Sequence, residues 1–250
     1  MKDLAPRPPQ PSPIVDDGDE FRFCSSCAFS AACLEQGYDK SALCGLHMLV
    51  EHIGPYDEGE HIFREGDPFN AIAAVRAGTV KTYVINPAGH EQVLGFHLPG
   101  EVIGLNAIHA SRYPCNAVAL ATVTLCRFSF PRMATLAARM PGLQLQLFRL
   151  LSQDIGRAEL LAGDQSADER MAAFLLSLSQ RYAARGFSPN RFQLTMARTD
   201  IGNYLRLAAE TVSRVLRRFQ DDGLIRVERR ELEILDREHL ETLARNVLRG

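Results

Sequence analysis

The chain has 250 residues with a formal net charge of −2, and its residues are 46% hydrophobic and 23% charged. This ordinary globular composition excludes a collagen-like or wholly disordered chain, and no apolar run reaches the roughly 18 residues of a membrane span. The first 20 residues lack the apolar core of a signal peptide, so we expect no export, no membrane partner and a cytoplasmic location.

The N-terminal part of the chain divides into a tail and a cysteine-rich segment. Residues 1–20 hold five prolines without hydrophobic periodicity, which predicts a flexible tail. Residues 21–54 hold four of the six cysteines, and Cys24, Cys27 and Cys33 are spaced C-x2-C-x5-C. Structural disulfides are disfavoured in the cytoplasm, so this cluster indicates a metal site. Zinc and an iron–sulfur cluster both accept four thiolates, and the spacing does not choose between them.

Three cysteines are candidates for a fourth ligand, namely Cys44, Cys115 and Cys126. Cys44 is the nearest along the chain, whereas Cys126 lies in an alternating run over residues 118–128. That run predicts a late β-strand, which can approach the N-terminal segment in space. A single cysteine in a strand is, however, more often a small buried hydrophobic residue. We read none of the seven histidines as a ligand.

Residues 55–140 contain short apolar stretches separated by glycine and proline at close intervals. Residues 80–85 alternate in character, and residues 86–89, Asn-Pro-Ala-Gly, supply a turn. Many short strands with frequent turn residues are typical of a barrel or jelly roll. We therefore predict a β-roll as the N-terminal domain.

The period of the hydrophobic pattern changes after Pro141, a favourable first residue of a helix. Residues 141–163 predict a long amphipathic helix. Its apolar stripe comprises Leu143, Leu147, Phe148, Leu151, Ile155 and Ala158. The stripe has two interpretations, as ordinary core of the same chain or as a surface that pairs with a second copy. A long helix between two domains has little core of its own to enter, which favours pairing.

Residues 163–166, Gly-Asp-Gln-Ser, end this helix, so a second domain is expected over residues 164–250. Residues 181–230 hold eleven arginines against five acidic residues, a net charge of +6 in a chain that is acidic as a whole. A basic segment within a mixed protein indicates a phosphate-bearing partner such as nucleic acid, although a solvated helical face gives the same count.

Residues 199–219 predict a helix-turn-helix. We expect Thr199 or Asp200 to cap a short first helix, a tight turn at Arg206, and a second helix that ends at Gly223. The second helix buries Val212, Val215, Leu216 and Phe219. The turn normally requires glycine at the position of Arg206, and a side chain in that conformation costs about 1 kcal/mol.

The opposite face of the second helix presents Glu210, Ser213, Arg214 and Arg217. Arginine can donate two hydrogen bonds to guanine and glutamate can accept one from cytosine, whereas Arg217 suits a phosphate. Residues 224–235 alternate on both sides of a charged turn and predict a two-stranded wing. The helix cap, the tight turn, the exposed polar residues and the wing occur together. This combination favours DNA binding over a plain helical hairpin.

Taken in order, these parts resemble the cyclic-AMP receptor/FNR superfamily of bacterial transcription regulators, and within it the FNR (fumarate and nitrate reduction regulator) branch. The residues that carry the resemblance are Cys24, Cys27, Cys33, Cys126 and residues 95–101, 185–189, 194–196, 200–205 and 210–214. The resemblance implies an α+β fold with a β-roll sensor domain, a dimerisation helix and a C-terminal winged helix-turn-helix.

The resemblance also implies a function. Cys24, Cys27, Cys33 and Cys126 would hold one oxygen-labile [4Fe–4S] cluster per subunit. The cluster-bearing protein would form a homodimer through the helix of residues 141–163, bind DNA of the TTGAT…ATCAA kind and contact RNA polymerase. It would act mainly as an activator of anaerobic metabolism. Ala158 departs from the best-known member, where an acidic residue opposes dimerisation in air.

Three other functions compete with this one. A cyclic-nucleotide sensor needs an Arg-Ser/Thr pair and a Glu where this chain has Cys115-Asn116 and Leu105, so we expect no cyclic nucleotide. A zinc-stabilised regulator that ignores oxygen is the main alternative. The chain has no P-loop, nucleophile elbow or H-E-x-x-H signature, so we expect no enzyme.

Overall fold

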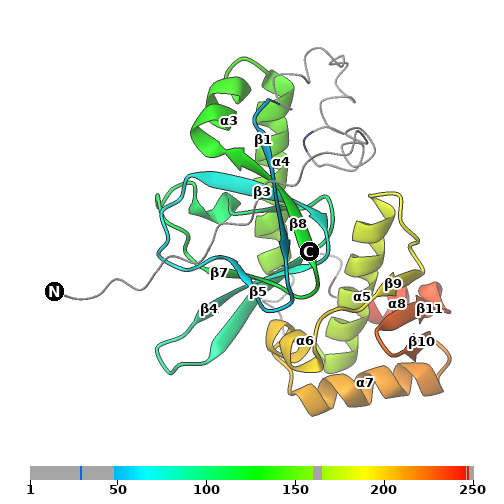
Figure 1. Cartoon of the computed structure of the whole chain (residues 1–250). Coiled ribbons are helices and arrows are strands. Elements are labelled where there is room, and N and C mark those ends of the chain that lie inside the picture. The colour runs from blue at the N-terminus through cyan, green and yellow to red at the C-terminus, as the bar shows by residue number, and fades with distance from the viewer. Residues whose placement is uncertain (1–28, 30–47, 160–164, 246, 248–250) are drawn as a thin grey trace.

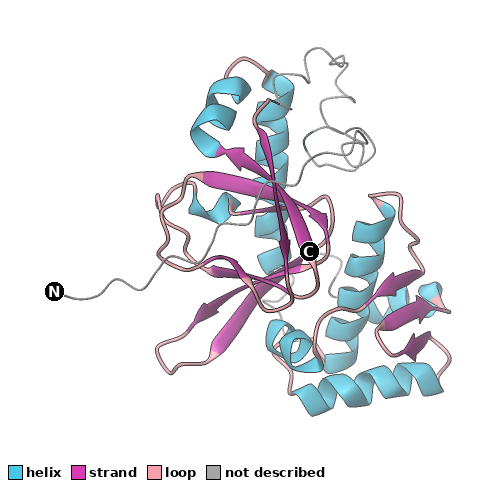
Figure 2. Cartoon of the chain, viewed as in Figure 1, coloured by secondary structure: helices cyan, strands magenta, loops and turns pink. Residues whose placement is uncertain are grey.

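The computed structural model describes residues 29, 48–159, 165–245 and 247, with only the backbone of residues 157–159. A β-rich domain comes first, a long helix runs alongside it, and a mainly helical domain follows (Figure 1). Strands are concentrated in the first domain and form one small sheet in the second (Figure 2). The predicted α+β class is confirmed. None of the helices within the described ranges is long and apolar enough to cross a membrane.

The β-rich domain is the predicted β-roll. Its strands are β1 (Val50–Tyr56), β2 (His61–Phe63), β3 (Ala71–Ala77), β4 (Val80–Ile85), β5 (Glu91–His97), β6 (Val102–Ile103), β7 (Asn116–Ala119) and β8 (Val123–Ser129). They form two antiparallel four-stranded sheets, β1-β8-β3-β6 and β2-β7-β4-β5. The predicted turn joins β4 to β5, and Asn86 Oδ1 accepts hydrogen bonds from the backbone N–H groups of Ala88 and His90.

Two helices follow the β-roll, α3 (Phe130–Ala137) and α4 (Pro141–Glu159). The predicted start of the long helix at Pro141 is confirmed, and its expected end near residue 163 lies outside the described residues. The apolar stripe of α4 divides between two environments. Leu143 is fully buried in the core of its own chain, whereas Phe148 and Ile155 remain 58% and 63% exposed. Leu143 therefore attaches α4 to the β-roll and has no surface to offer a partner.

The second domain contains three more strands and four helices. They are α5 (Ala167–Ala183), β9 (Arg191–Gln193), α6 (Arg198–Leu205), α7 (Ala209–Asp221), β10 (Ile225–Glu228), β11 (Glu231–Ile234) and α8 (Arg237–Ala244). Helix α5 begins at a capping box, in which the Ser166 and Glu169 side chains each bond the other residue's backbone N–H. The predicted wing, β10 and β11, is confirmed and gains β9 as a third strand.

The start of the helix-turn-helix differs from the prediction. Helix α6 begins at Arg198 after Ala197, with no side-chain cap, so Thr199 and Asp200 lie inside the helix and cap nothing. The Asp200 carboxylate instead pairs with Lys81 of β4. The predicted burial of Val212, Val215, Leu216 and Phe219 on α7 is confirmed.

Candidate DNA-binding face and thiolate site

Helices α6 and α7 are joined by a tight turn. The geometry of this turn accounts for the backbone conformation of Arg206 and for the glycine at position 202. Arg206 adopts the left-handed conformation, with φ of 56°, as the sequence predicted for the turn. Gly202 on α6 allows the returning chain to approach closely, since a Cβ there would lie 2.6 Å from the carbonyl oxygen of Leu207. The Leu207 N–H donates to the Gly202 carbonyl at 2.8 Å. Position 202 is thus closed to larger residues, a requirement the sequence analysis did not identify.

Helix α7 presents the predicted polar face to solvent. Glu210, Ser213, Arg214 and Arg217 are all exposed, on the side opposite the buried apolar residues. Ser213 Oγ donates to the carbonyl of Ala209 at 3.1 Å, and Arg214 Nη2 lies 3.4 Å from Thr211 Oγ1. A helix of 13 residues spans about 20 Å, and the major groove is about 12 Å wide and admits such a helix. This face can donate and accept hydrogen bonds at base edges.

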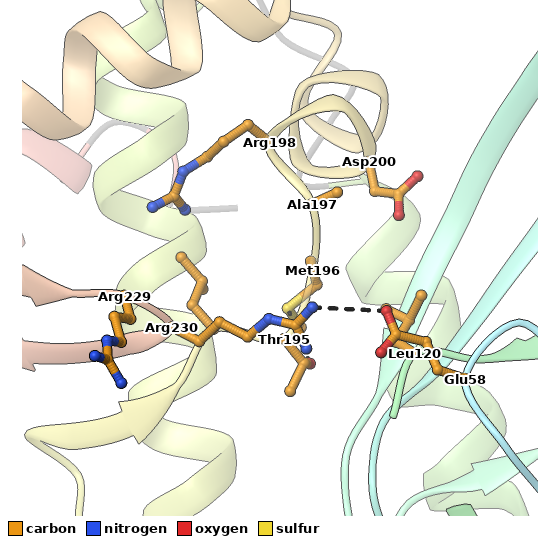
Figure 3. A pocket seen from close by; sticks show the side chains of 10 residues that line it. Glu58, Leu120, Thr195, Met196, Ala197, Arg198, Asp200, Arg229 and Arg230 are labelled. Carbon is orange, nitrogen blue, oxygen red and sulfur yellow. Dashed lines mark hydrogen bonds and ion pairs between the residues drawn. The ribbon is translucent and has the colours of Figure 1, made fainter. Parts of the chain in front are cut away.

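Further arginines gather between the wing and the start of α6, at a cavity of about 260 Å³ next to the β-roll (Figure 3). Arg198, Arg229 and Arg230 line it from the second domain and Glu58 from the first. Arg230 Nη2 lies 3.6 Å from Glu58 Oε1, and burial lowers the pKa of the Arg198 guanidinium. These arginines belong to the predicted basic segment, but no pattern in the sequence assigned them to a site.

Not every arginine of the basic segment is available to a ligand. Arg218, on α7, forms an ion pair with Asp168 of α5, and Arg191 forms two hydrogen bonds with Glu231 across the small sheet. Arg226 pairs with Glu233 at 3.1 Å. These arginines are already paired within the domain, so the count of basic residues overstates the charge offered to a partner.

The candidate thiolate site is described in part. Cys126 is half-buried on β8, where its Cα lies opposite His52 of β1 and Ala74 of β3. Cys24, Cys27, Cys33 and Cys44 lie outside the described residues. Within the ranges the structure describes, no three His, Cys, Asp or Glu side chains gather as a metal site.

Phe29, between Cys27 and Cys33 in the sequence, packs against β8. Its side chain is fully buried, and its ring meets that of Phe128 edge to face at 5.2 Å between centroids. Phe29 and Phe128 belong to a hydrophobic core against which Cys126 also packs. Phe29 therefore lies beside the strand that carries Cys126.

Cys115 occupies a different environment from Cys126. It is 1% exposed in a separate core of the β-roll, and Asn106 Nδ2 lies 3.4 Å from its sulfur. Burial raises the pKa of the Cys115 thiol. Because a metal ligand must be a thiolate, this environment disfavours Cys115 as the fourth ligand.

Comparison with known proteins agrees with this architecture. The Crp-like helix-turn-helix domain family matches residues 169–243, and the cyclic nucleotide-binding domain family matches residues 54–140. The transcriptional activator protein anr of Pseudomonas aeruginosa is 44% identical over 91% of this chain and 94% of its own length. The fumarate and nitrate reduction regulatory protein of Salmonella typhi is 40% identical over 88% of this chain and 90% of its own.

A solved structure is similar to this fold. FixK2 from Bradyrhizobium japonicum covers 78% of this chain and 96% of its own, with 26% identity and a TM-score of 0.68. The curated relatives carry the names of transcription regulators and not of enzymes. The chain therefore belongs to the Crp/FNR family, as an FNR/Anr-type transcriptional activator with a DNA-binding helix-turn-helix domain.

Proposed function

We propose that this chain is an oxygen-responsive activator that works in the cytoplasm. Without oxygen it holds one [4Fe–4S] cluster per subunit, forms a homodimer through α4 and binds a two-fold DNA site of the TTGAT…ATCAA kind. The observation that supports the proposal is the burial of Phe29, which lies between Cys27 and Cys33 in the sequence, against Phe128 of the strand that carries Cys126.

The donor set fits an iron–sulfur cluster. Cys24, Cys27 and Cys33 from the N-terminal segment and Cys126 from β8 would supply four thiolates, the ligand set of a [4Fe–4S] cluster. When bound, the cluster would supply iron–thiolate bonds that join the N-terminal segment to β8. These bonds would be lost when oxygen destroys the cluster. Cys115 remains a buried thiol in another core.

The chain's own packing supplies a route from this site to the dimer helix. Phe29 and Phe128 share their hydrophobic core with Leu143 and Leu150 of α4. A change in the position of Phe29 would therefore change the core that supports α4. Such a local change is sufficient to bias a dimerisation equilibrium between two states.

Helix α4 offers an apolar surface for pairing. Phe148 and Ile155 are the exposed members of the predicted stripe, and the structure adds Leu145, which the sequence analysis left out. Leu147 and Leu151 are partly buried and pack against the core. The side chain of Ala158 is not described. Exposed apolar side chains along one helix favour burial against a second copy.

For DNA recognition, we propose that Glu210, Ser213 and Arg214 contact base edges and that Arg217 contacts a phosphate. Phosphate contacts set the register of the complex, whereas base contacts carry its specificity. Promoter-bound dimers would contact RNA polymerase, as the activator names of the relatives suggest.

We propose that no cyclic nucleotide regulates the chain. Leu105, Cys115 and Asn116, at the positions a nucleotide would need, are buried. Asn116 Oδ1 accepts a hydrogen bond from the Glu65 N–H at 3.1 Å, so that polar group is already used inside the protein. Calorimetry that detects cyclic AMP binding near micromolar concentration would contradict this part of the proposal.

The decisive experiment is anaerobic purification followed by iron and acid-labile sulfide analysis. We expect four iron and four sulfide per chain, as the formula of one [4Fe–4S] cluster requires, with a visible chromophore that air bleaches. Cys126→Ala should abolish this chromophore, and the matched variant Cys115→Ala should keep it. Zinc in place of iron, with DNA binding unchanged by air, would establish the alternative of an oxygen-insensitive regulator.

A further inference from the structure

The two domains meet along an open sheet edge. Strand β5 ends the sheet β2-β7-β4-β5, so among the residues that the structure describes no strand lies on the other side of its backbone. Asn203 of α6 occupies that side. Its Oδ1 accepts from the N–H of Val93 at 2.8 Å, and its Nδ2 donates to the carbonyl of Glu91 at 2.6 Å. A single amide of the helix-turn-helix thus pairs with the edge as a short strand would.

An ion pair lies beside this amide. Lys81 of β4 is 8% exposed, and its Nζ is 3.0 Å from Asp200 Oδ1 on α6 and 3.0 Å from Glu91 Oε2. A shielded ion pair stabilises only when its geometry is good, so it favours one relative placement of the two elements. Val93 and Phe96 share a hydrophobic core with α5, α6 and α7, and Figure 1 places α6 against the β4–β5 hairpin.

This docked arrangement leaves the DNA-binding face open. Asn203 and Asp200 engage the β-roll from α6, while Glu210, Arg214 and the rest of the polar face of α7 stay exposed. The junction therefore orients α7 without covering it.

We propose that Asn203 and Lys81 are positioning residues that set the half-site spacing the dimer accepts. A two-fold site requires two recognition helices about 34–36 Å apart, or a multiple of that distance. If only the polypeptide chain joined each helix-turn-helix to the β-roll, the pair would sample many separations and discriminate weakly between spacings. Because α6 docks on β5, the position of each α7 is set relative to the domain that carries α4. The inference rests on the proposed dimeric DNA binding.

The test uses the full chain, prepared without oxygen, and synthetic duplexes with TTGAT and ATCAA half-sites. One series varies the spacer a base pair at a time, and a further duplex carries a single half-site. The variants are Asn203→Ala, Lys81→Met and the two combined. The matched control is Gln92→Ala, which removes an exposed amide on β5 that makes none of these contacts. Thermal unfolding of each variant checks that it is folded.

We expect the wild type to prefer one spacer. Each lost hydrogen bond weakens an equilibrium by about two- to tenfold. We therefore expect the preference for the best spacer over its neighbours to fall about threefold in Asn203→Ala and about tenfold in the double variant. Half-site affinity and the salt dependence of binding should not change, because neither residue is proposed to touch DNA. Gln92→Ala should match the wild type.

Three results would overturn the inference. Equal loss on every duplex, half-site included, would make Asn203 a DNA contact or a merely structural residue. Tighter binding by the variants would make the junction a block to DNA. Small-angle scattering of the free protein gives a readout independent of DNA and cluster, and an unchanged maximum dimension in the double variant would show that the junction does not hold the domains. An iron-free wild type that keeps its spacer preference would contradict only the proposed function.

Discussion

Replacing Glu101 with glutamine removes a buried negative charge that two arginines of the other domain share. Glu101 is 2% exposed, and its Oε1 accepts from Arg181 Nε at 2.8 Å. Its Oε2 accepts from Arg181 Nη2 at 2.6 Å and from the Leu98 N–H at 2.9 Å. Arg185 Nη2 lies 3.5 Å from Oε1. The variant leaves two shielded guanidinium groups without this counter-charge.

The cost follows from the state of Arg181. Burial alone would lower the pKa of its guanidinium, but the nearby Glu101 carboxylate more than offsets this effect and the pKa is raised. Arg181 stays charged even when this carboxylate is replaced, because a guanidinium group does not lose its proton in proteins at pH 7. Removing one partner of a buried ion pair costs about 3–5 kcal/mol, and we expect about 3 kcal/mol for Glu101→Gln because glutamine retains one carbonyl oxygen as an acceptor.

Urea unfolding of the full chain at pH 7 measures this loss. The matched control is Glu233→Gln, which breaks an exposed pair with Arg226 and should change the free energy of unfolding by less than about 1 kcal/mol. Glu101→Met combined with Arg181→Met and Arg185→Met should regain most of the loss, since apolar replacement of a whole buried ionic triad is often neutral or stabilising. A loss below about 1 kcal/mol in Glu101→Gln would refute this reasoning.

Three further predictions concern stability, base reading and assembly. Arg206→Gly should raise the free energy of unfolding by about 1 kcal/mol, because glycine adopts the φ of 56° without strain; a lower melting temperature would contradict it. Arg214→Ala should cost about 1–3 kcal/mol of DNA-binding energy at one base position, measured on singly substituted duplexes, whereas a uniform loss would indicate a phosphate contact. Ile155→Glu should turn the anaerobic dimer into a monomer in sedimentation velocity, whereas Gln153→Glu, exposed elsewhere on α4, should leave it intact.

The features predicted correctly are those fixed by nearby residues. The burial of Val212 and Phe219 follows from helical periodicity, and the turn between β4 and β5 follows from an asparagine that bonds its own backbone two and four residues on. The strained Arg206 was identified because only the turn geometry of a helix-turn-helix demands a left-handed residue there. In each case the physical cause lies within about ten residues.

The errors arose where a distant contact decides the outcome. Asp200 is a good capping residue by type, but its carboxylate pairs with Lys81 of the other domain, and α6 starts two residues earlier. Leu143 fits the periodicity of a pairing surface, yet the β-roll buries it completely. Strand β9 is only three residues long, too short for its alternation to be recognised. No local pattern contains this information.

The thiolate site depends both on nearby residues and on distant contacts. The spacing of Cys24, Cys27 and Cys33 indicated a metal centre, but it left the fourth ligand open between cysteines near and far in sequence. The packing of Phe29 against Phe128 favours Cys126, and the burial of Cys115 in another core disfavours that alternative. Nothing in the sequence indicates that an aromatic residue between two cysteines is buried against a distant strand.

The two sheets of the β-roll contact different parts of the molecule, and we expect this difference to affect regulation. Sheet β1-β8-β3-β6 carries Cys126 and borders the core that supports α4, whereas sheet β2-β7-β4-β5 ends in the edge that docks α6. We therefore expect a change at the cysteines to reach the proposed dimer helix through one sheet, while the other sheet keeps the helix-turn-helix in place. We expect the two properties to separate: Cys126→Ala should weaken dimerisation, and Asn203→Ala should relax half-site spacing in a protein that still dimerises. A variant at either position that changed both properties equally would show that the β-roll transmits the signal as a single rigid unit.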